Sequence, residues 1–141
     1  HDHISFFENL PIRKHLLAED SKPFEQLNVF DTAVFIINDE IHRGKERVEQ
    51  ILWPAHCIQH THGAELHEDL QLVRSNEQRH VIHLLKGYDR DIDSYSAFWD
   101  NQKIRETSLH EQLKEHRVEQ VFIVGIATDV CVYSTALHAV E

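Results

Sequence analysis

Two short, continuous apolar runs stand out in the second half of the chain. They are residues 80–85 (HVIHLL) and 121–125 (VFIVG), and both have the length of a β-strand. Neither run alternates apolar with polar residues, a pattern typical of strands in a parallel sheet that is covered on both faces. We therefore predict two buried strands here.

A helical pattern follows each of these runs. Residues 107–117 place Leu109 and Leu113 four apart among charges, which predicts an amphipathic helix with Ser108 as its N-cap. Residues 130–140 are apolar nearly all round, which predicts a buried helix. The order strand, helix, strand, helix predicts an α/β fold in three layers, with helices flanking a parallel sheet.

The first half is less regular. The first thirty residues show little periodicity and read as loop with short helical pieces. Residues 33–37 (AVFII) form a β-branched and aromatic run that predicts a strand. Residues 47–53 (RVEQILW) fit either a return strand or a short helix, and the turn residues between favour a hairpin. Without repeats or linkers, we expect one domain over residues 1–141.

Charge and composition exclude several classes of function. The formal net charge of −10 argues against binding to nucleic acid or to an anionic membrane surface, since both need clustered Lys and Arg. No apolar run approaches the ~18 residues of a transmembrane helix, and no signal peptide is visible. Two cysteines cannot build a disulfide framework, which favours a reducing, intracellular location: the cytoplasm, with the nucleus as an alternative.

Two reactive side chains are predicted at one edge of this sheet. Lys86 follows the first strand of the second half, and Cys131 follows the next strand at the first turn of a helix. Ligands bind beyond the carboxyl ends of parallel strands. A thiol at a helix N-terminus beside an ammonium group is stabilised as the nucleophilic thiolate. The alternative is a buried Cys that acts only as a small apolar residue, and the pattern alone leaves both open.

Histidines offer a weaker signal. His3 and His56 are ligand types that zinc or iron accepts, but they lie far apart in the sequence. His60, His62 and His67 lie in a polar, turn-like stretch and are interpreted as solvated. Cys57, next to His56, has no helix start close behind it and is interpreted as a packing residue.

Four motifs, in order, resemble the nicotinamidases of the isochorismatase-like cysteine hydrolase superfamily, especially the eukaryotic branch. The motifs span almost the whole chain and are residues 2–6 (DHISF), 53–57 (WPAHC), 86–87 with 93–98 (KG and DSYSAF), and 125–132 (GIATDVCV). This resemblance implies an enzyme that hydrolyses nicotinamide to nicotinate and ammonia in NAD salvage. It places Cys131 as the nucleophile and Lys86 as the catalytic lysine.

The same resemblance implies further roles. The peptide before Ala127 is expected to be cis, and the backbone N–H groups of Ala127 and Cys131 form the oxyanion hole. Trp53 and Tyr95 match aromatic residues that sandwich the substrate ring.

The resemblance also implies a divalent metal ion, with zinc first and iron or manganese as alternatives. His56 matches the metal-binding histidine that orients the pyridine nitrogen. His3 matches a ligand found in some relatives.

The chain departs from the family pattern at both ends. The third catalytic residue, an Asp on the first strand, has no counterpart, nor has the Asp-x-His pair that supplies two metal ligands; the final strand is also missing. We therefore expect a fragment that is inactive alone and unstable or homo-oligomeric. Two alternatives remain: a related amidohydrolase that acts on carbamoyl compounds, and a non-catalytic homologue that serves as a binding domain. Isochorismatases proper lack the cysteine at position 131.

Overall fold

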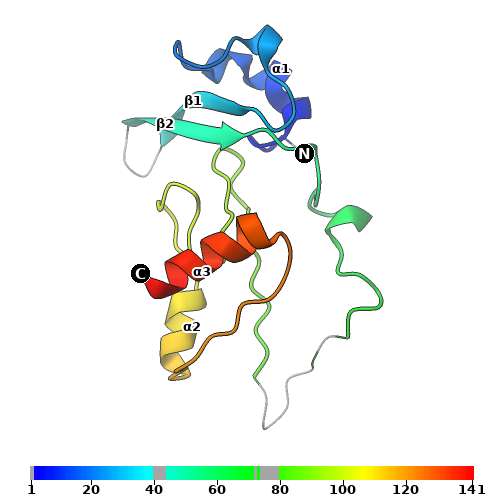
Figure 1. Cartoon of the computed structure of the whole chain (residues 1–141), viewed down its shortest axis with the longest axis vertical. Coiled ribbons are helices and arrows are strands. Elements are labelled where there is room, and N and C mark those ends of the chain that lie inside the picture. Colours follow the sequence, from blue (N-terminus) through cyan, green and yellow to red (C-terminus); the bar gives the residue numbers. More distant parts are fainter. Residues whose placement is uncertain (1, 40–43, 72, 74–79) are drawn as a thin grey trace.

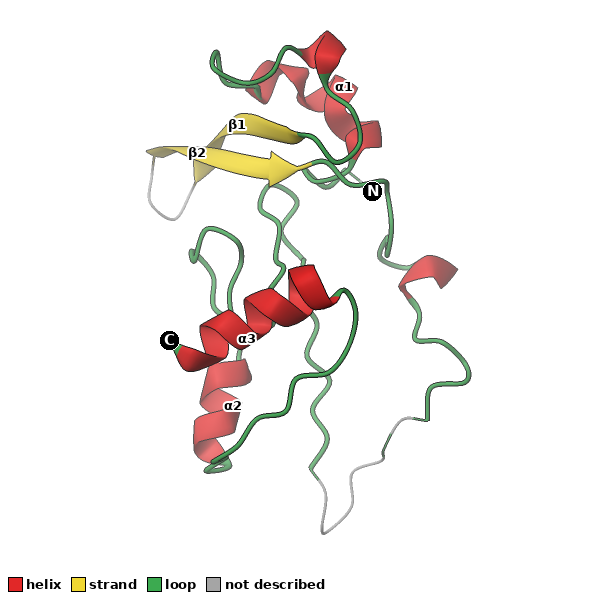
Figure 2. Cartoon of the chain, viewed as in Figure 1, coloured by secondary structure: helices red, strands yellow, loops and turns green. Residues whose placement is uncertain are grey.

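The computed structural model describes residues 2–39, 44–71, 73 and 80–141. A β-hairpin and short helices form one end of an elongated molecule, α2 and α3 lie toward the other, and long loops join them (Figures 1 and 2). The elements, in chain order, are a 3₁₀ turn (Phe7–Asn9), α1 (Leu10–Arg13), two 3₁₀ turns (Lys14–Leu16 and Phe24–Gln26), β1 (Thr32–Asp39), β2 (Gly44–Ile51), a 3₁₀ turn (His62–Ala64), α2 (Leu109–Glu115), a π-helical turn (Thr128–Val132) and α3 (Tyr133–Val140).

The predicted hairpin is confirmed. β1 and β2 pair antiparallel, with Phe35 opposite Val48. Ala33, Phe35 and Ile37 alternate inward along β1, as expected for a strand with one buried face. The connection at residues 40–43 lies outside the described residues.

The core packs on the inner face of this hairpin. Its buried apolar residues come almost entirely from the first 52 positions, and they are Ile4, Leu10, Leu27, Ala33, Phe35, Ile37, Val48, Leu52 and Ile92. The N-terminal segment lies beside the continuation of β2, because Trp53 N–H donates to Ser5 O (2.7 Å) and Phe7 N–H to Trp53 O (2.8 Å). These bonds hold residues 53–57 at the end of the core.

The two predicted parallel strands are not found in the described part of the chain. Residues 80–85 and 121–125 carry no strand pairing, and the single sheet there is the antiparallel hairpin. Phe122 is 85% exposed and Val124 is 90% exposed. A strand needs a neighbour for its backbone N–H and C=O groups, and the described residues place no strand beside either segment.

Both predicted helices of the second half form. α2 begins after Ser108, although the side-chain bond there comes from Thr107, whose hydroxyl accepts the N–H of Leu109 (3.1 Å). The prediction that residues 130–140 are buried is wrong, since Tyr133 and Val140 are exposed and α3 holds no buried residue. The apolar sides of α3 have little packed against them within the described residues. None of the helices described here is long and apolar enough to cross a membrane.

Candidate active site

Lys86 and Cys131 meet, as the sequence predicts. Lys86 Nζ lies 3.6 Å from Cys131 Sγ, although 45 residues separate them. Lys86 follows the extended segment 80–85, and Cys131 lies in the π-helical turn that begins α3. The ammonium therefore places a positive charge directly beside the thiol. The roles assigned to both residues stay predictions.

The loop at residues 94–97 holds both partners in place. Lys86 Nζ donates to Ser94 O at 2.6 Å. Thr135 Oγ1 donates to Cys131 O at 2.7 Å and accepts the N–H of Ala97 at 3.0 Å. One loop thus anchors the lysine directly and the helix start through Thr135, which fixes the distance between ammonium and thiol.

A cavity of about 420 Å³ surrounds this pair. That volume is within the usual range for small-molecule sites. Six of the seven residues predicted for the site line it, together with five others; the full lining is Trp53, His56, Cys57, Lys86, Asp93, Ser94, Tyr95, Ile126, Ala127, Val130 and Cys131. Segments from three distant parts of the sequence therefore converge on one pocket.

Trp53 and Tyr95 form the aromatic wall of the cavity. Their rings stand edge to face at 84°, with centroids 6.3 Å apart, and Trp53 Nε1 donates to Tyr95 Oη at 3.1 Å. Burial raises the pKa of the Tyr95 hydroxyl, and the negative charge of Asp93 adds to the effect, so the phenol stays protonated at neutral pH. The rings do not face each other in parallel as a sandwich would require.

The turn before Cys131 has the backbone that the resemblance implies. The peptide bond between Ile126 and Ala127 is cis. Ala127 O accepts the N–H groups of Val130 (3.2 Å) and Val132 (3.1 Å), which closes the turn at the start of the helix. The oxyanion hole assigned to Ala127 and Cys131 remains a prediction.

His56 has the orientation that a ligand needs. It is exposed, lines the cavity, and its Nδ1 lies 2.7 Å from Pro54 O. A carbonyl can only accept, so Nδ1 donates this hydrogen bond, and in the neutral ring the lone pair for a substrate or metal is then on Nε2.

His3 does not fit the same role. It lies outside the cavity, and the N–H of Ser5 points at its Nδ1 (3.2 Å), which makes Nδ1 an acceptor and puts the proton of a neutral ring on Nε2. Burial lowers its pKa, which keeps the ring neutral. Within the described ranges, no three His, Cys, Asp or Glu side chains gather into a metal site. The predicted metal site is therefore not confirmed.

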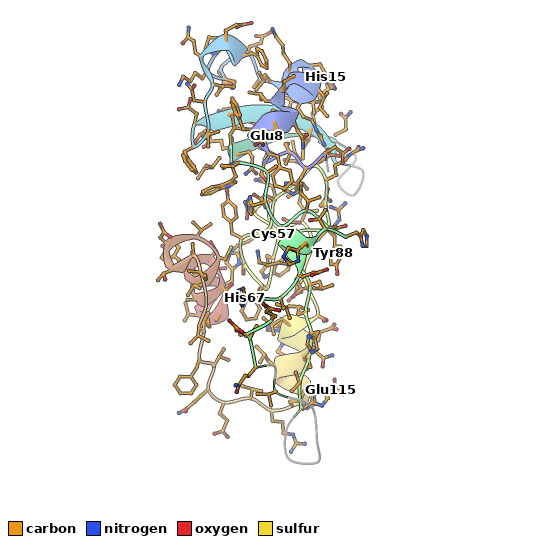
Figure 3. The ribbon with its side chains drawn as sticks, turned by 90° about the vertical axis from the view of Figure 1, so that its right-hand side faces the viewer. Glu8, His15, Cys57, His67, Tyr88 and Glu115 are labelled. Carbon is orange, nitrogen blue, oxygen red and sulfur yellow. The ribbon has the colours of Figure 1, made fainter. Side chains whose placement is uncertain are left out.

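Cys57 is not a packing residue. It is exposed, has a positive φ of 47°, and lines the cavity that holds Cys131. It lies midway along the molecule, between the hairpin end and α2 (Figure 3). The sequence interpretation failed because the backbone turns at Cys57, which leaves this residue exposed at the cavity and not packed in the core.

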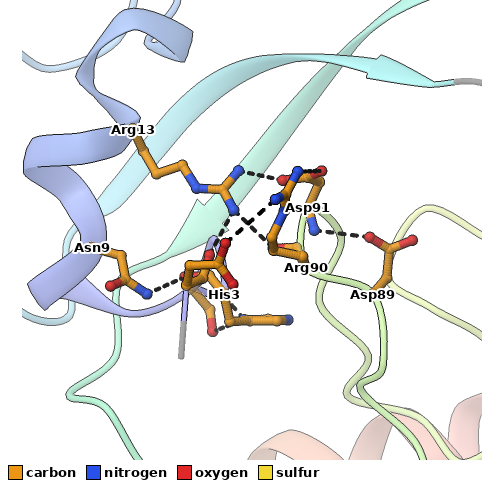
Figure 4. Close-up of polar contacts among 8 residues, drawn as sticks. His3, Asn9, Arg13, Asp89, Arg90 and Asp91 are labelled. Carbon is orange, nitrogen blue, oxygen red and sulfur yellow. Dashed lines mark hydrogen bonds and ion pairs between the residues drawn. The ribbon is translucent and has the colours of Figure 1, made fainter.

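A buried arginine holds the N-terminal segment against the loop that leads to Tyr95. The guanidinium of Arg13 pairs with Asp91 and also donates to Asp2 O at 2.6 Å (Figure 4). Partial burial acts to raise the pKa of Asp91, but the hydrogen bond and charge of Arg13, with the charge of Arg90, outweigh it and keep that pKa low. This ion pair holds the start of the segment 91–95, which leads to Tyr95, against the N-terminal segment.

Sequence reasoning missed Asp93 and Gln50. Asp93 lines the cavity two residues before Tyr95, and its Oδ2 lies 3.1 Å from the side-chain nitrogen of Gln50. The sequence held a signal for Gln50, since this polar residue alternates with the apolar residues Val48 and Leu52.

A comparison with known proteins finds one matching family and several similar proteins. The family model described as the isochorismatase domain matches residues 13–141. The nicotinamidase of Acinetobacter baylyi is 47% identical over 90 residues, which are 64% of this chain and 40% of that protein. The nicotinamidase of Saccharomyces cerevisiae is 37% identical over 93 residues, which are 66% of this chain and 42% of that protein.

Solved structures give the same result. An Acinetobacter baumanii nicotinamidase/pyrazinamidase superposes with a TM-score of 0.69 at 38% identity, over 99% of this chain and 53% of that one. The yeast nicotinamidase bound to the inhibitor nicotinaldehyde superposes with a TM-score of 0.65 at 29% identity. This match covers 98% of this chain and 56% of that one. The chain thus spans about half the length of the relatives that it matches. With the family model covering nearly all of its residues, the chain belongs to the isochorismatase domain family, whose members have an α/β fold.

Proposed function

We propose that this protein is a cysteine amidohydrolase that converts nicotinamide to nicotinate and ammonia, as a step of NAD salvage inside the cell. One observation carries the proposal: the Lys86 ammonium lies 3.6 Å from the Cys131 thiol in a cavity walled by Trp53 and Tyr95. An activated thiol suits acyl transfer, and an aromatic wall suits a flat heteroaromatic ring.

The chemistry follows from these groups. The Cys131 thiolate attacks the carboxamide carbon, and the backbone N–H groups of Ala127 and Cys131 stabilise the oxyanion. The carbon–nitrogen bond then breaks, and the departing nitrogen takes up from solvent the proton that Cys131 lost on forming the thiolate and leaves as ammonia. Water hydrolyses the thioester, which releases nicotinate and restores the thiol. Lys86 stabilises the thiolate before attack and after hydrolysis.

We also propose that the protein binds a divalent metal ion, most readily zinc. Of the described residues we assign one ligand to it, His56. His56 would supply a ligand through Nε2, at the end of the cavity that Trp53 also lines. The residues described here do not make a full coordination set, since a zinc site takes three or four protein ligands. No step of the mechanism is therefore assigned to the metal.

We also propose that residues 80–85 and 121–125 are strands of a parallel sheet in the complete protein. Their apolar sequences and the exposure of Phe122 and Val124 support this, because a covered sheet would bury those side chains. The same exposed side chains support the expectation of self-association for the 141-residue chain.

Nicotinamide is favoured over a carbamoyl compound by one feature. Trp53 and Tyr95 offer an aromatic wall, which a small aliphatic carbamoyl group does not need. The similar yeast structure holds nicotinaldehyde, which has the same pyridine ring as nicotinamide. A purely binding function would leave the contact between Lys86 and Cys131 without a use.

The test measures ammonia and nicotinate released by the full-length protein. Wild type is expected to turn over nicotinamide, and Cys131→Ala should lose on the order of 10³-fold or more. Benzamide, which has the same shape without the ring nitrogen, should react more slowly if His56 contacts that nitrogen. Hydrolysis of an aliphatic carbamoyl substrate in preference to nicotinamide would replace this proposal with the first alternative, and no hydrolysis of either would support a binding protein.

A further inference from the structure

A polar side chain occupies a core position on β2. Val48, Gln50 and Leu52 point inward in alternation and are 1%, 1% and 0% exposed, while Arg47 and Glu49 face solvent. An apolar residue would fill the middle position without cost, whereas a buried amide must find hydrogen-bond partners. The hydrogen-bond partners of the Gln50 side chain therefore indicate why an amide occupies this buried position.

Those partners belong to the candidate site. Gln50 Nε2 lies 3.1 Å from Asp93 Oδ2 and 3.3 Å from Tyr95 Oη, and it also lies 2.8 Å from Ile51 O. Asp93 and Tyr95 both line the cavity. The amide thus ties the loop that carries two cavity residues to β2, a strand held by its pairing with β1.

The hydrogen bonds of Gln50 to the loop, which we call the tether, connect through Tyr95 to the second aromatic residue, Trp53. Tyr95 Oη also accepts the indole N–H of Trp53 at 3.1 Å, so one phenol oxygen lies between the amide of Gln50 and the ring of Trp53. Asp93 is fixed in addition by the N–H of Ser94, which donates to Oδ1 at 2.8 Å. Without the amide, Tyr95 would keep one hydrogen bond from Trp53, and its ring could turn with the loop.

We propose that Gln50 is a positioning residue for substrate: from the core, its amide sets the placement of Tyr95 and, through the shared hydrogen bond, of Trp53, and so shapes the aromatic wall that receives the substrate ring. This inference rests on the function proposed above. It predicts that Gln50 acts on substrate binding more than on the chemical step, because it contacts neither Lys86 nor Cys131 in the structure.

Three variants of the full-length protein test the proposal. Gln50→Met keeps the length of the side chain and removes the amide. Val48→Ala is the matched control, because it removes packing from the neighbouring inward position of the same strand without touching the cavity. Tyr95→Phe removes the oxygen that Gln50 holds.

With nicotinamide, Gln50→Met should raise KM about 3- to 10-fold, the range for one lost hydrogen bond, and should change kcat less than about 2-fold. Val48→Ala should lower the unfolding temperature and leave KM unchanged. The double variant of Gln50→Met and Tyr95→Phe should raise KM by clearly less than the product of the two single effects, since both variants remove the contact between Gln50 and Tyr95. An unchanged KM in Gln50→Met, or effects that multiply in the double variant, would overturn the proposal.

A second readout is independent of the reaction. Trp53 and Trp99 are the two tryptophans of the 141 residues, so Trp99→Phe made in this 141-residue chain leaves Trp53 as its sole indole reporter. In that background, Gln50→Met should shift the emission of Trp53 and increase its quenching by acrylamide, while Val48→Ala should do neither. If emission shifts but wild type does not hydrolyse nicotinamide, the tether stands and the proposed function fails. If wild type is active and emission does not shift, the tether fails alone.

Discussion

The ammonium of Lys86 lies between the thiol of Cys131 and the carbonyl oxygen of Ser94. Its Nζ is 3.6 Å from Sγ and 2.6 Å from the oxygen. The carbonyl oxygen accepts a hydrogen bond from the ammonium, and this bond holds the positively charged group beside the sulfur. A lysine held from both sides is a fixed charge, which stabilises a thiolate better than a mobile surface lysine.

Lys86→Met should reduce nicotinamide hydrolysis by on the order of 10²- to 10⁴-fold, because the charge beside the thiol is lost. Lys86→Arg keeps the charge but not the compact ammonium, and we expect it to recover only part of the rate. The measurement is kcat/KM together with the rate of Cys131 alkylation by iodoacetamide, which reports thiolate directly. Normal alkylation in Lys86→Met would show that the lysine does not activate the thiol.

Cys57→Ala should keep most of the activity, whereas Cys131→Ala should be inactive. Both thiols line the cavity, but it is Cys131 that Lys86 contacts. Cys131→Ser should be nearly as inactive as the alanine variant, since a hydroxyl does not ionise at neutral pH even beside a cation. Nicotinate formation by the three variants decides the matter. If Cys57→Ala were inactive and Cys131→Ala active, Cys57 would be the nucleophile. The assignment of the oxyanion hole to Ala127 and Cys131 would then also be wrong.

The ion pair between Arg13 and Asp91 should make stability depend on pH. The pKa of Asp91 is lower in the folded state than its ordinary value of 3.8, so its stabilising contribution is complete above that value and is lost as the pH falls through the lowered one. Asp91→Asn should cost about 1 to 2 kcal/mol at pH 7, the lower part of the range for charged hydrogen bonds, since Asp91 keeps 35% of its side-chain surface in water.

Urea unfolding of wild type and Asp91→Asn at pH 7 and near pH 3 tests this expectation. The difference between the two proteins should shrink as the pH falls below 3.8, because the carboxylate of the unfolded wild type takes up a proton there that the folded state resists. Asp20→Asn serves as a comparison, because Arg47 also lowers the pKa of that carboxyl but the pair lies at the surface, where it contributes less to stability. A gap between wild type and Asp91→Asn that stays constant with pH would contradict the assignment.

Asp100 should matter for the stability of the loop behind the cavity. It is buried, its Oδ1 accepts the N–H groups of Gln102 (2.9 Å) and Ile104 (3.0 Å), and its Oδ2 accepts that of Arg105 (2.7 Å). Asp100→Ala leaves these donors without their partner and should cost about 2 to 3 kcal/mol. Asp100→Asn keeps one acceptor oxygen and should cost less. Equal unfolding midpoints for wild type and Asp100→Ala would show that the turn closes without the carboxylate.

Local pattern was sufficient where neighbours in sequence make the structure. The apolar run at 33–37 and the strand that follows it, β2, form the hairpin. Residues such as Phe35 and Val48 pair across the two strands and bury one face of the hairpin without partners that are distant in the sequence. The helix after Ser108 forms for the same local reason. The predicted strand at 121–125 depended on neighbouring strands, and the described residues supply none, so its apolar side chains are left in water.

By itself the sequence pointed to residues that could do chemistry: the pattern indicates Cys131 next to a helix start and Lys86 after an apolar run, and the resemblance to the nicotinamidases indicates Trp53 and Tyr95. Only the tertiary structure decided which of them share one cavity. It placed His56 in the cavity and His3 outside it, and it left Cys57 exposed at the same cavity. The reason is physical: distances between residues far apart in sequence are set by buried contacts such as those of Gln50, which no periodicity in the chain reveals.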